Sequence, residues 1–358
     1  MKLVTVIGAR PQFIKAAAVS RVLSTYPDVE EIILHTGQHY DADMSEIFFT
    51  EMGLPRPKYN INVNGLNHGA MTGQMMEKIE EVLLVEQPDW VLVFGDTNST
   101  LAGALAAKKL HIKVAHVEAG LRSFNMAMPE EINRLLTDRI SDILFCPTAT
   151  AMENLEKEGY GSFPIERINI GDVMYDAAMM FTPQAKRPAG DVPDNFVLAT
   201  MHRSQNTDSE KSLREIFAAL EQVAAEQPLV MPLHPRTRRK LEELHYDLSN
   251  SAICFLPPVG YLEMLWLLSH CTMVMTDSGG LQKEAYFFKK MCITLRNETE
   301  WVELVKAGCN KVAGTTTSAI LEAYHKVLSL SVMPSFEQQF YGHGNAAHTI
   351  ASMLWQNS

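Results

Sequence analysis

The sequence predicts an α/β protein of two doubly wound domains, each built on a parallel sheet with helices on both faces. The chain has 358 residues, of which 46% are hydrophobic, and this is enough apolar material for two cores. Short apolar runs alternate with amphipathic segments of helical length, as in parallel sheets covered by helices. The alternation pauses at a stretch that carries Pro and Gly, residues 183–194, and then starts again.

The first half of the chain supplies the elements of one such domain. Its predicted strands are the apolar runs at residues 3–9, 31–36, 90–95, 114–118 and 143–146. Predicted helices lie between them at residues 12–24, 69–86 and 97–109. We therefore predict a first domain over residues 1–172.

The second half repeats the pattern, with predicted strands at residues 196–200, 229–233, 252–256, 273–276 and 292–295. We predict a second domain over residues 173–341 and a terminal segment, residues 342–358, whose helix packs back on the first domain. Ligands of open parallel sheets bind at the carboxyl ends of the strands, so two facing sheets would form a cleft between the domains. The chemistry is expected in the strand-to-helix loops.

Charge and composition disfavour several classes of function. A net charge of −11 disfavours nucleic-acid binding, which needs many Lys and Arg contacts. No apolar stretch approaches the roughly 20 residues of a bilayer span, and the first one is too short for a signal peptide. The five cysteines are dispersed and show no C-x-x-C spacing. We expect a soluble cytoplasmic protein with reduced thiols and no membrane partner.

The loop after the first predicted strand carries two cations. The segment Gly8-Ala9-Arg10-Pro11 enters a helix that also contains Lys15, so a nucleotide-sugar phosphate could lie there. Because there is no G-x-G-x-x-G, dinucleotide binding is disfavoured. Taken alone, such a segment is more often a helix start with solvated charges.

The second domain has a better candidate for a phosphate site, at Ser278-Gly279-Gly280. A strand ends there, two glycines allow close backbone approach, and a helix begins with free amide groups. Glu284, one helical turn later, could accept the hydroxyls of a ribose. An ordinary glycine turn with Ser278 as helix cap is an equal alternative.

Two further strand ends of the second domain carry histidine and arginine side chains. One has His202-Arg203 and the other has His234 and Arg236. A single histidine at such a place is usually structural. Two His/Arg clusters at successive strand ends favour an anion pocket that faces the Gly279-Gly280 loop.

The first domain contributes carboxylates at strand ends, Asp96 and Glu118, and at a helix start, Glu130-Glu131. Acid/base catalysis needs carboxyl groups whose pKa is tuned by burial and neighbours. A glutamate at a helix N-terminus after Pro129 could instead interact with the helix dipole, and we expect this role for one of the pair.

Asp41-Ala42-Asp43 resembles a D-x-D metal motif only superficially. Asp43 followed by Glu46 also fits the start of a helix, with the residues spaced as in a capping box. We favour that interpretation and predict no metal site.

Several motifs together resemble the non-hydrolysing UDP-N-acetylglucosamine 2-epimerase family. Nearly the whole chain contributes to this resemblance, and the order and spacing of the motifs are specific. The motifs are Gly8-Ala9-Arg10-Pro11 with Lys15, Thr36-Gly37-Gln38-His39, Gly95-Asp96-Thr97, His116-Val117-Glu118-Ala119-Gly120-Leu121-Arg122, Met128-Pro129-Glu130-Glu131-Ile132-Asn133-Arg134, His202-Arg203, His234-Pro235-Arg236-Thr237 and Asp277-Ser278-Gly279-Gly280 with Glu284.

The resemblance implies two Rossmann-like domains facing across a cleft (glycosyltransferase-B-like), often as a homodimer, and an epimerase that needs no cofactor. The implied reaction inverts C2 of a UDP-linked N-acetylated sugar by elimination and readdition of UDP. By motif match, Asp96, Glu118 and Glu130 are the acid/base candidates, and Lys15 and His202 stabilise or orient the departing diphosphate. The other matches to substrate or nucleotide positions are Arg10, Gln38, Arg203, His234, Arg236, Ser278, Gly279, Gly280 and Glu284.

Departures from the family pattern point to a branch. Trp301 replaces a common arginine, and Gln205 stands where a glutamate is common. Trp301 and the segment Arg122-Ser123-Phe124-Asn125 together resemble the branch of the family that acts on UDP-2,3-diacetamido-2,3-dideoxyglucuronate in bacterial polysaccharide synthesis. UDP-N-acetylglucosamine is the competing substrate. Allosteric activation by substrate stays open, because Asp41 stands where the family often has Gln or Glu.

Two other functions are compatible with the sequence. A glycosyltransferase of the same fold would use a UDP-sugar donor and would share the Gly279-Gly280 loop and Glu284. It would not need the carboxylates of the first domain. A noncatalytic sensor of sugar nucleotides would have lost Asp96, Glu118 or Glu130, and none of them is missing.

Overall fold

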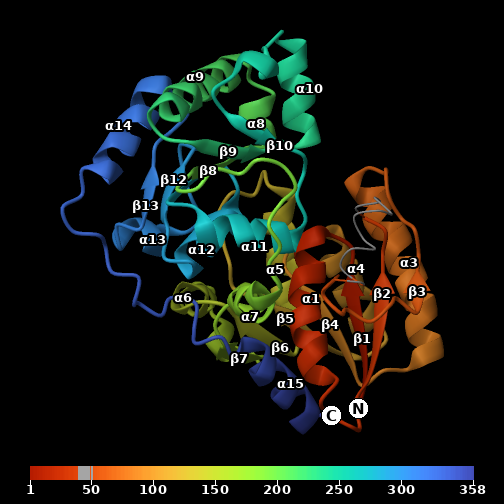
Figure 1. Ribbon diagram of the computed structural model, residues 1–358. Helices are drawn as coiled ribbons and strands as arrows, with labels where there is room; N and C mark the ends of the chain where they lie inside the picture. The colour runs from red at the N-terminus through yellow and green to blue at the C-terminus, as the bar shows by residue number, and fades with distance from the viewer. Residues whose placement is uncertain (39–48, 50) are drawn as a thin grey trace. The chain divides into compact units, whose positions relative to one another are not determined.

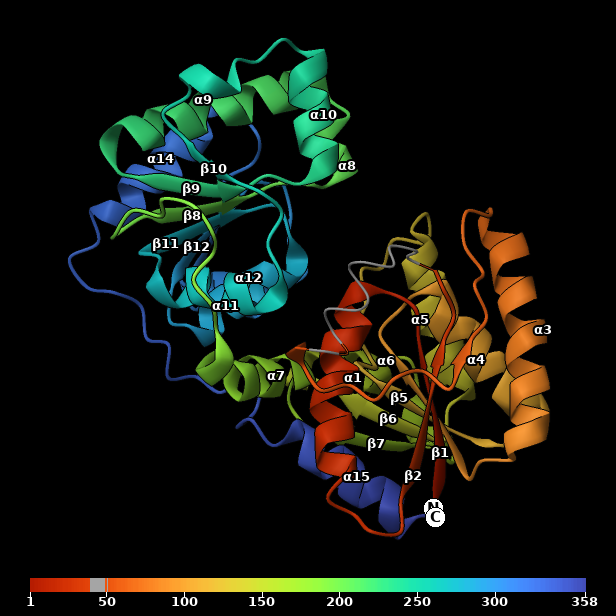
Figure 2. The ribbon, with the colours of Figure 1, turned by 45° about the vertical axis from the view of Figure 1, so that its right-hand side comes forward.

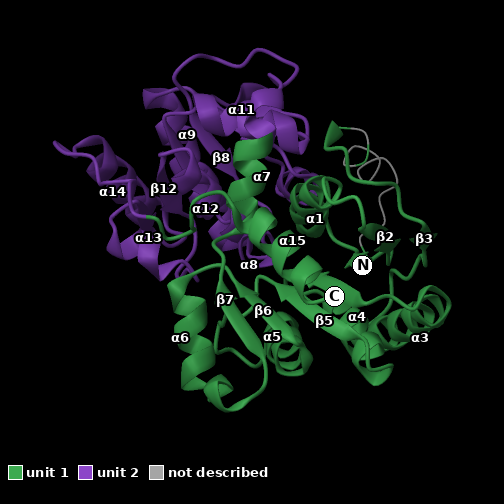
Figure 3. Ribbon diagram, turned by 90° about the horizontal axis from the view of Figure 1, so that it is seen from below, with its two compact units in different colours: residues 1–180, 339–358 green, residues 181–338 purple. Residues whose placement is uncertain are grey.

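The computed structural model describes residues 1–38, 49 and 51–358 and divides the chain into two compact units (Figure 3). Unit 1 comprises residues 1–180 and 339–358, and unit 2 comprises residues 181–338. The first change of unit lies at the end of helix α7 (Val173–Phe181). Asp176 of α7 accepts a hydrogen bond from the backbone nitrogen of Ala347 at 2.7 Å, which ties this helix to the terminal segment of unit 1.

Unit 1 contains a parallel sheet whose order, in the described part of the chain, is β3-β2-β1-β4-β5-β6-β7 (Figure 1). Its strands are β1 (Lys2–Ile7), β2 (Glu30–His35), β3 (Tyr59–Asn60), β4 (Trp90–Phe94), β5 (Lys113–Val117), β6 (Ile143–Cys146) and β7 (Glu166–Asn169). The middle strands are apolar and buried on both faces, as expected for parallel strands between two helical layers.

Helices cover both faces of this sheet. On one face α3 (His68–Glu86) and α4 (Asn98–Lys109) pack against Val4, Val6 and Val93. The other face carries α1 (Arg10–Leu23) with α15 (Ala346–Gln356) beside it, as Figures 1 and 2 show. The remaining helices of described residues in the unit are α5 (Pro129–Ile140), α6 (Ala149–Lys157) and α7.

Unit 2 repeats the architecture with the strand order β10-β9-β8-β11-β12-β13, again parallel. Helices α9 (Glu210–Glu226) and α14 (Thr317–Leu328) bury one face, and α11 (Tyr261–His270) and α12 (Gly279–Phe287) bury the other. The strands are β8 (Val197–Thr200), β9 (Leu229–Pro232), β10 (Cys254–Leu256), β11 (Met273–Thr276), β12 (Met291–Thr294) and β13 (Asn310–Val312). Short helices α8 (Ser204–Thr207), α10 (Pro235–Glu243) and α13 (Val302–Lys306) lie between them.

Both sheets have the strand order typical of Rossmann-like domains, and the predicted fold class is confirmed. Three edge strands, β3, β7 and β13, were not predicted. β7 has the sequence Glu-Arg-Ile-Asn, and an edge strand of this kind needs no apolar run because it is half exposed. The terminal helix begins at Ala346 rather than near 342, because Gly342 and Gly344 have φ of 79° and 76°.

The cysteines are free, and only Cys254 is partly exposed. Within the described part of the chain, none of the helices combines the length and apolar character needed to cross a bilayer.

Candidate functional site

The candidate residues of unit 1 lie after the carboxyl ends of four strands, β2, β1, β4 and β5, in α1, and in the first turn of α5. Strands β1 and β4 are neighbours at the place where the strand order reverses, and ligands of such sheets bind there. The loops that follow these strands carry Arg10, Asp96 and Glu118.

The loop from β1 into α1 is fixed by Gln12, which the sequence analysis missed. Its Oε1 accepts hydrogen bonds from the backbone nitrogens of Gly8 at 2.8 Å and Ala9 at 3.0 Å. Its Nε2 donates to the carbonyl oxygen of Phe94 at 2.7 Å. Gln12 therefore joins the ends of β1 and β4 and sets the position of Arg10, the first residue of α1.

Glu118 follows β5 directly and forms a salt bridge with the buried Lys15 of α1. The φ of Glu118 is +73°, a left-handed conformation that costs a non-glycine residue about 1–2 kcal/mol. Gly95 gives this pair its space, because a Cβ at Gly95 would lie 3.2 Å from Glu118 Oε2 and 3.8 Å from Lys15 Nζ. Backbone strain of this kind concentrates at functional sites.

Asp96 lies between this pair and a second cation. Its carboxylate is 2.5 Å from Arg134 Nη1, and its side chain is 35% exposed. Burial among the surrounding atoms raises the pKa of Asp96, Arg134 opposes the rise, and the negative charge of Glu118 adds to it. Smaller effects come from Lys15 and Glu130. The structure therefore brings four predicted residues, Lys15, Asp96, Glu118 and Glu130, within electrostatic reach of one another.

The two adjacent glutamates at the start of α5 have different surroundings. Glu131 is 1% exposed and accepts hydrogen bonds from the backbone nitrogens of Ser123 and Phe124, each at 2.9 Å. Burial favours a higher pKa for Glu131, but these hydrogen bonds and Arg134 at 2.6 Å lower it below its ordinary value. Glu130 is exposed. Glu131 is thus the structural member of the pair, and Glu130 is free to meet a ligand.

Gln38 lies at the carboxyl end of β2. Its Oε1 accepts hydrogen bonds from the backbone nitrogen of Ser99 at 3.0 Å and from Ser99 Oγ at 2.7 Å, which join it to the start of α4. These bonds fix the side chain of Gln38. Asp41 and Asp43 lie outside the described residues.

In unit 2, the buried carboxylate of Asp277 organises the loop after β8. It accepts hydrogen bonds from the backbone nitrogens of His202 at 3.1 Å and Arg203 at 3.0 Å, and from Asn206 Nδ2 at 3.1 Å. Asn206 was not predicted. Because Asp277 follows β11, these bonds hold the β8 and β11 loops together at the point where the strand order of this sheet reverses.

The two glycines at the start of α12, Gly279 and Gly280, have different surroundings. A Cβ at Gly279 would lie 2.1 Å from Glu300 Oε1, so a side chain at this position would displace Glu300. A Cβ at Gly280 would have no neighbour within 4 Å. Ser278 Oγ accepts a long hydrogen bond, 3.5 Å, from the backbone nitrogen of Leu281, the helix-capping contact of the alternative interpretation.

The segment after β12 braces this helix start through residues whose role was not predicted. Glu300 accepts a hydrogen bond from Arg296 Nη1 at 3.0 Å. Trp301 is 6% exposed, and its Nε1 donates to the carbonyl oxygen of Gly279 at 2.8 Å. The ammonium of Lys283 lies 4.4 Å from the centre of the Trp301 ring. Trp301 therefore orients the first turn of α12 and contacts a cation.

The other predicted residues of unit 2 lie near this loop system. The rings of His202 and His234 are 5.5 Å apart, and His234 caps α10 by accepting from the backbone nitrogen of Arg236 at 3.1 Å. The Arg236 side chain forms a salt bridge of 2.6 Å with Asp208, which lowers the pKa of Asp208. Glu284, one turn into α12, is 7% exposed.

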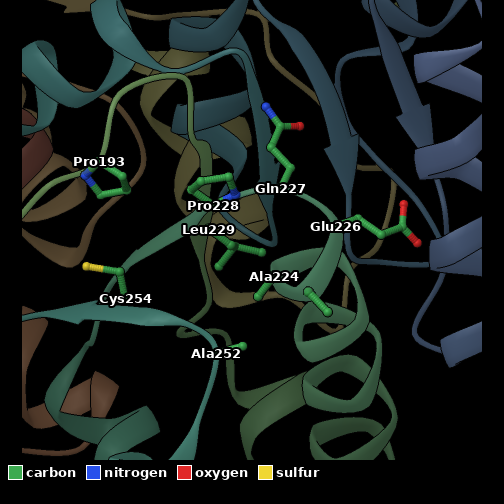
Figure 4. Close-up of a pocket in the computed structure, with 9 residues that line it drawn as sticks. Pro193, Ala224, Glu226, Gln227, Pro228, Leu229, Ala252 and Cys254 are labelled. Carbon is green, nitrogen blue, oxygen red and sulfur yellow. The ribbon is translucent and has the colours of Figure 1, made fainter.

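A pocket of about 310 Å³ in unit 2 lies away from all these residues (Figure 4). It is formed by the end of α9, the start of β9, and Pro193, Ala252 and Cys254. These residues lie at the amino ends of the strands, opposite the loops described above. It contains no charged group other than Glu226, and we assign it no part in the candidate site.

Comparisons with known proteins identify the family. A family model described as UDP-N-acetylglucosamine 2-epimerase matches residues 21–355. A UDP-2,3-diacetamido-2,3-dideoxy-D-glucuronate 2-epimerase of Pseudomonas aeruginosa is 52% identical, over 99% of this chain and 99% of that one.

Solved structures of similar proteins agree with the fold. The UDP-GlcNAc 2-epimerase of Methanocaldococcus jannaschii, in complex with UDP-GlcNAc and UDP, is 40% identical, with a TM-score of 0.89 over 99% of this chain and 100% of that one. The enzyme of Neisseria meningitidis bound to UDP-GlcNAc is 30% identical, with a TM-score of 0.88 over 99% and 100%. The pair of Rossmann-like domains is therefore glycosyltransferase-B-like, as predicted, and the chain belongs to the UDP-N-acetylglucosamine 2-epimerase family.

Proposed function

We propose that this protein is a UDP-sugar 2-epimerase, which inverts C2 of a UDP-linked N-acetylated sugar. The observation that carries the proposal is the cluster of Asp96 and Glu118, at the ends of adjacent strands, with Lys15 of α1, in a chain of this family. Epimerisation without oxidation needs groups that remove and return a proton on opposite faces of one carbon. The two carboxyl groups of this cluster supply them.

The proposed reaction is an elimination followed by its reverse. A base takes the proton from C2, the C–H electron pair forms a C1–C2 double bond, and the C1–O bond breaks with its electrons leaving on UDP. A proton is then delivered to C2 from the other face, and a phosphate oxygen of UDP attacks C1. The net change is one inverted centre, and no electrons are gained or lost.

The surroundings of the two carboxyl groups suit different roles. Glu118 lies against the ammonium of Lys15, and we assign it the role of the base. Burial raises the pKa of Asp96, so Asp96 holds a proton more readily and is the candidate acid. Pairs of carboxyl groups with divergent environments commonly divide acid and base roles in this way. Glu130, exposed at the start of α5, is the third candidate.

Unit 2 supplies the nucleotide site in this proposal. Gly280 leaves open space at the N-terminus of α12, where a diphosphate meets free amide groups and the positive end of the helix dipole. Glu284 on the same helix is the ribose partner. Asp277 holds the backbone of His202 and Arg203, so these two side chains can meet the departing diphosphate.

The substrate that we propose is UDP-2,3-diacetamido-2,3-dideoxyglucuronate. Support comes from the relative of that name and from Trp301, which is packed on the start of α12. UDP-N-acetylglucosamine is the alternative substrate, and a glycosyltransferase that uses a UDP-sugar donor is the alternative function. The proposal also includes a cytoplasmic homodimer in the synthesis of bacterial surface polysaccharide such as O-antigen.

The test is a turnover experiment in deuterated water, followed by NMR. The purified protein is incubated with each UDP-sugar, with no added nicotinamide or metal. We expect the manno epimer with one deuterium at C2, and label in the substrate pool after prolonged incubation. Product that retains its original C2 hydrogen contradicts the elimination mechanism, and transfer of the sugar to an added acceptor would favour the glycosyltransferase.

A further inference from the structure

A buried polar cluster lies under the carboxylate loops of unit 1 and has no place in the chemistry above. It consists of His116 on β5, Asp138 on α5 and Arg122 in the loop between them. All three side chains have zero solvent exposure. Burying charged groups is costly unless each one is paired and hydrogen-bonded.

His116 joins the end of β4 to helix α5. Its Nε2 lies 2.7 Å from the carbonyl oxygen of Gly95, and its Nδ1 lies 2.7 Å from Asp138 Oδ1. A carbonyl oxygen and an ionised carboxylate are acceptors only, so each ring nitrogen must donate. These partners therefore assign a hydrogen to both nitrogens, which makes His116 an imidazolium.

Asp138 uses its other oxygen on the loop after Glu118. Oδ2 accepts hydrogen bonds from the backbone nitrogen of Gly120 at 3.1 Å and from Arg122 Nη1 at 2.7 Å. Burial favours a higher pKa for Asp138, but His116 and Arg122 bring it below its ordinary value, so the carboxylate is ionised. Arg122 also pairs with Glu158 at 2.7 Å, and the two cations and two anions balance.

Both loops that this cluster holds turn through left-handed residues, of which the non-glycine residue Glu118 is the strained one. Gly95, Glu118 and Gly120 have φ of 64°, 73° and 76°. Gly95 precedes Asp96, and Gly120 follows Glu118 by two residues. The cluster thus holds the loop of each acid/base carboxyl group from beneath, through one carbonyl and one amide.

We propose that His116 and Asp138 are positioning residues, which set the spacing of Asp96 and Glu118 for the reaction. This inference rests on the proposed function. Neither residue reaches the substrate. They act by holding the two loops in register, and a displacement of about 1 Å in such a site can lower the rate of the chemical step about a hundredfold.

The test compares conservative variants of two carboxylates that contact β5 at opposite ends. Asp138→Asn keeps the size of the side chain but replaces one acceptor oxygen with a donor, which then faces the N–H of His116 or of Gly120. Asp142→Asn is the matched control. Asp142 accepts from the backbone nitrogen of Val114 at 2.8 Å and pairs with Lys108 at 2.5 Å, at the opposite end of β5.

We expect kcat of Asp138→Asn to fall at least tenfold, with KM and the Kd for UDP within about threefold of wild type. Calorimetry gives the Kd, and a thermal melt shows that the variant is folded at the assay temperature. Asp142→Asn should keep kcat within about twofold. A folded Asp138→Asn variant with the kcat of the control overturns the inference.

A second measurement does not depend on turnover or on the folding of a variant. In ¹⁵N-labelled wild-type protein, NMR should show a directly bonded hydrogen on each ring nitrogen of His116, assigned by the loss of both signals in His116→Gln. A single N–H on His116 would show that the ring does not donate hydrogen bonds to both Gly95 and Asp138, which overturns the proposed link between the two loops. Wild-type protein that epimerises no UDP-sugar would refute the proposed function, and the positioning role with it, whatever the variants do.

Discussion

Glu118 and Asp96 are carboxyl side chains at neighbouring strand ends, and each lies against a different cation. Glu118 contacts Lys15 and has a strained backbone, whereas Asp96 contacts Arg134 and has a raised pKa for which burial is the main cause. Strain and a shifted pKa are independent signs of function. Glu131, in contrast, has a structural role, because its carboxylate accepts hydrogen bonds from backbone amides and pairs with Arg134.

At this scale we predict the effect of Glu118→Gln. The amide keeps the size of the side chain but cannot take a proton, so turnover should fall by about a hundredfold or more. The Kd for UDP should change little, because the proposed nucleotide site lies in unit 2. Kinetics and calorimetry measure the two quantities.

The matched control is Glu156→Gln, which alters an exposed glutamate of unit 1 that pairs with Arg167. It should have wild-type turnover. Turnover of Glu118→Gln at the rate of this control would show that another group is the base.

At the scale of one element, α12 shows how a helix start is shaped by what packs on it. Trp301 bonds the carbonyl of Gly279, and Glu300 fills the space where a Gly279 side chain would lie. Gly280, the next residue, is open. Two adjacent glycines in the sequence thus have different reasons to be glycine. Steric packing explains the first, and access for a ligand is the reason that we propose for the second.

This difference predicts that a substitution at Gly280 affects UDP binding, whereas a substitution at Gly279 affects thermal stability. Gly280→Val should leave the thermal stability within a few degrees of wild type but weaken UDP binding at least tenfold, because the branched side chain enters the open space. Gly279→Ala should lower the melting temperature, because its Cβ meets Glu300.

Calorimetry with UDP and thermal melts separate the two effects. Unchanged UDP affinity in Gly280→Val would place the phosphates at another loop. A Gly279→Ala variant as stable as wild type would show that Glu300 can move aside.

At the scale of the whole molecule, the chain divides its chemistry between two units. Unit 1 holds the carboxyl cluster and unit 2 holds the candidate nucleotide loops. Each set lies where the strand order of its sheet reverses. In the proposed reaction one UDP-sugar uses both sets, and its sugar and nucleotide parts are recognised separately.

Substrate choice is the prediction that belongs to this scale. We expect a higher kcat/KM for UDP-2,3-diacetamido-2,3-dideoxyglucuronate than for UDP-N-acetylglucosamine, since this ratio measures differential binding of the transition states. Competition between the two sugars in one tube, read by NMR, gives the ratio directly. A preference for UDP-N-acetylglucosamine would refute the branch assignment and leave the family membership intact.

The sequence by itself determined the fold class and the buried strands, because an apolar run such as Ile143–Cys146 has one stable place, between two helical layers. It also identified the family from the order of its motifs, and it placed most candidate residues in strand-to-helix loops. The edge strands β3, β7 and β13 were not predicted from the sequence, and β7, for example, has no apolar run.

Only the tertiary structure decided which member of Glu130-Glu131 is structural and which glycine of Gly279-Gly280 is open. It also showed that Arg122 is buried in ion pairs under the loops. The physical reason is that local spacing fixes the conformation of a segment, whereas the role of a polar side chain depends on its partners. His116 and Asp138 are 22 residues apart, and Gly95 is 21 residues from His116. Only folding brings these groups together.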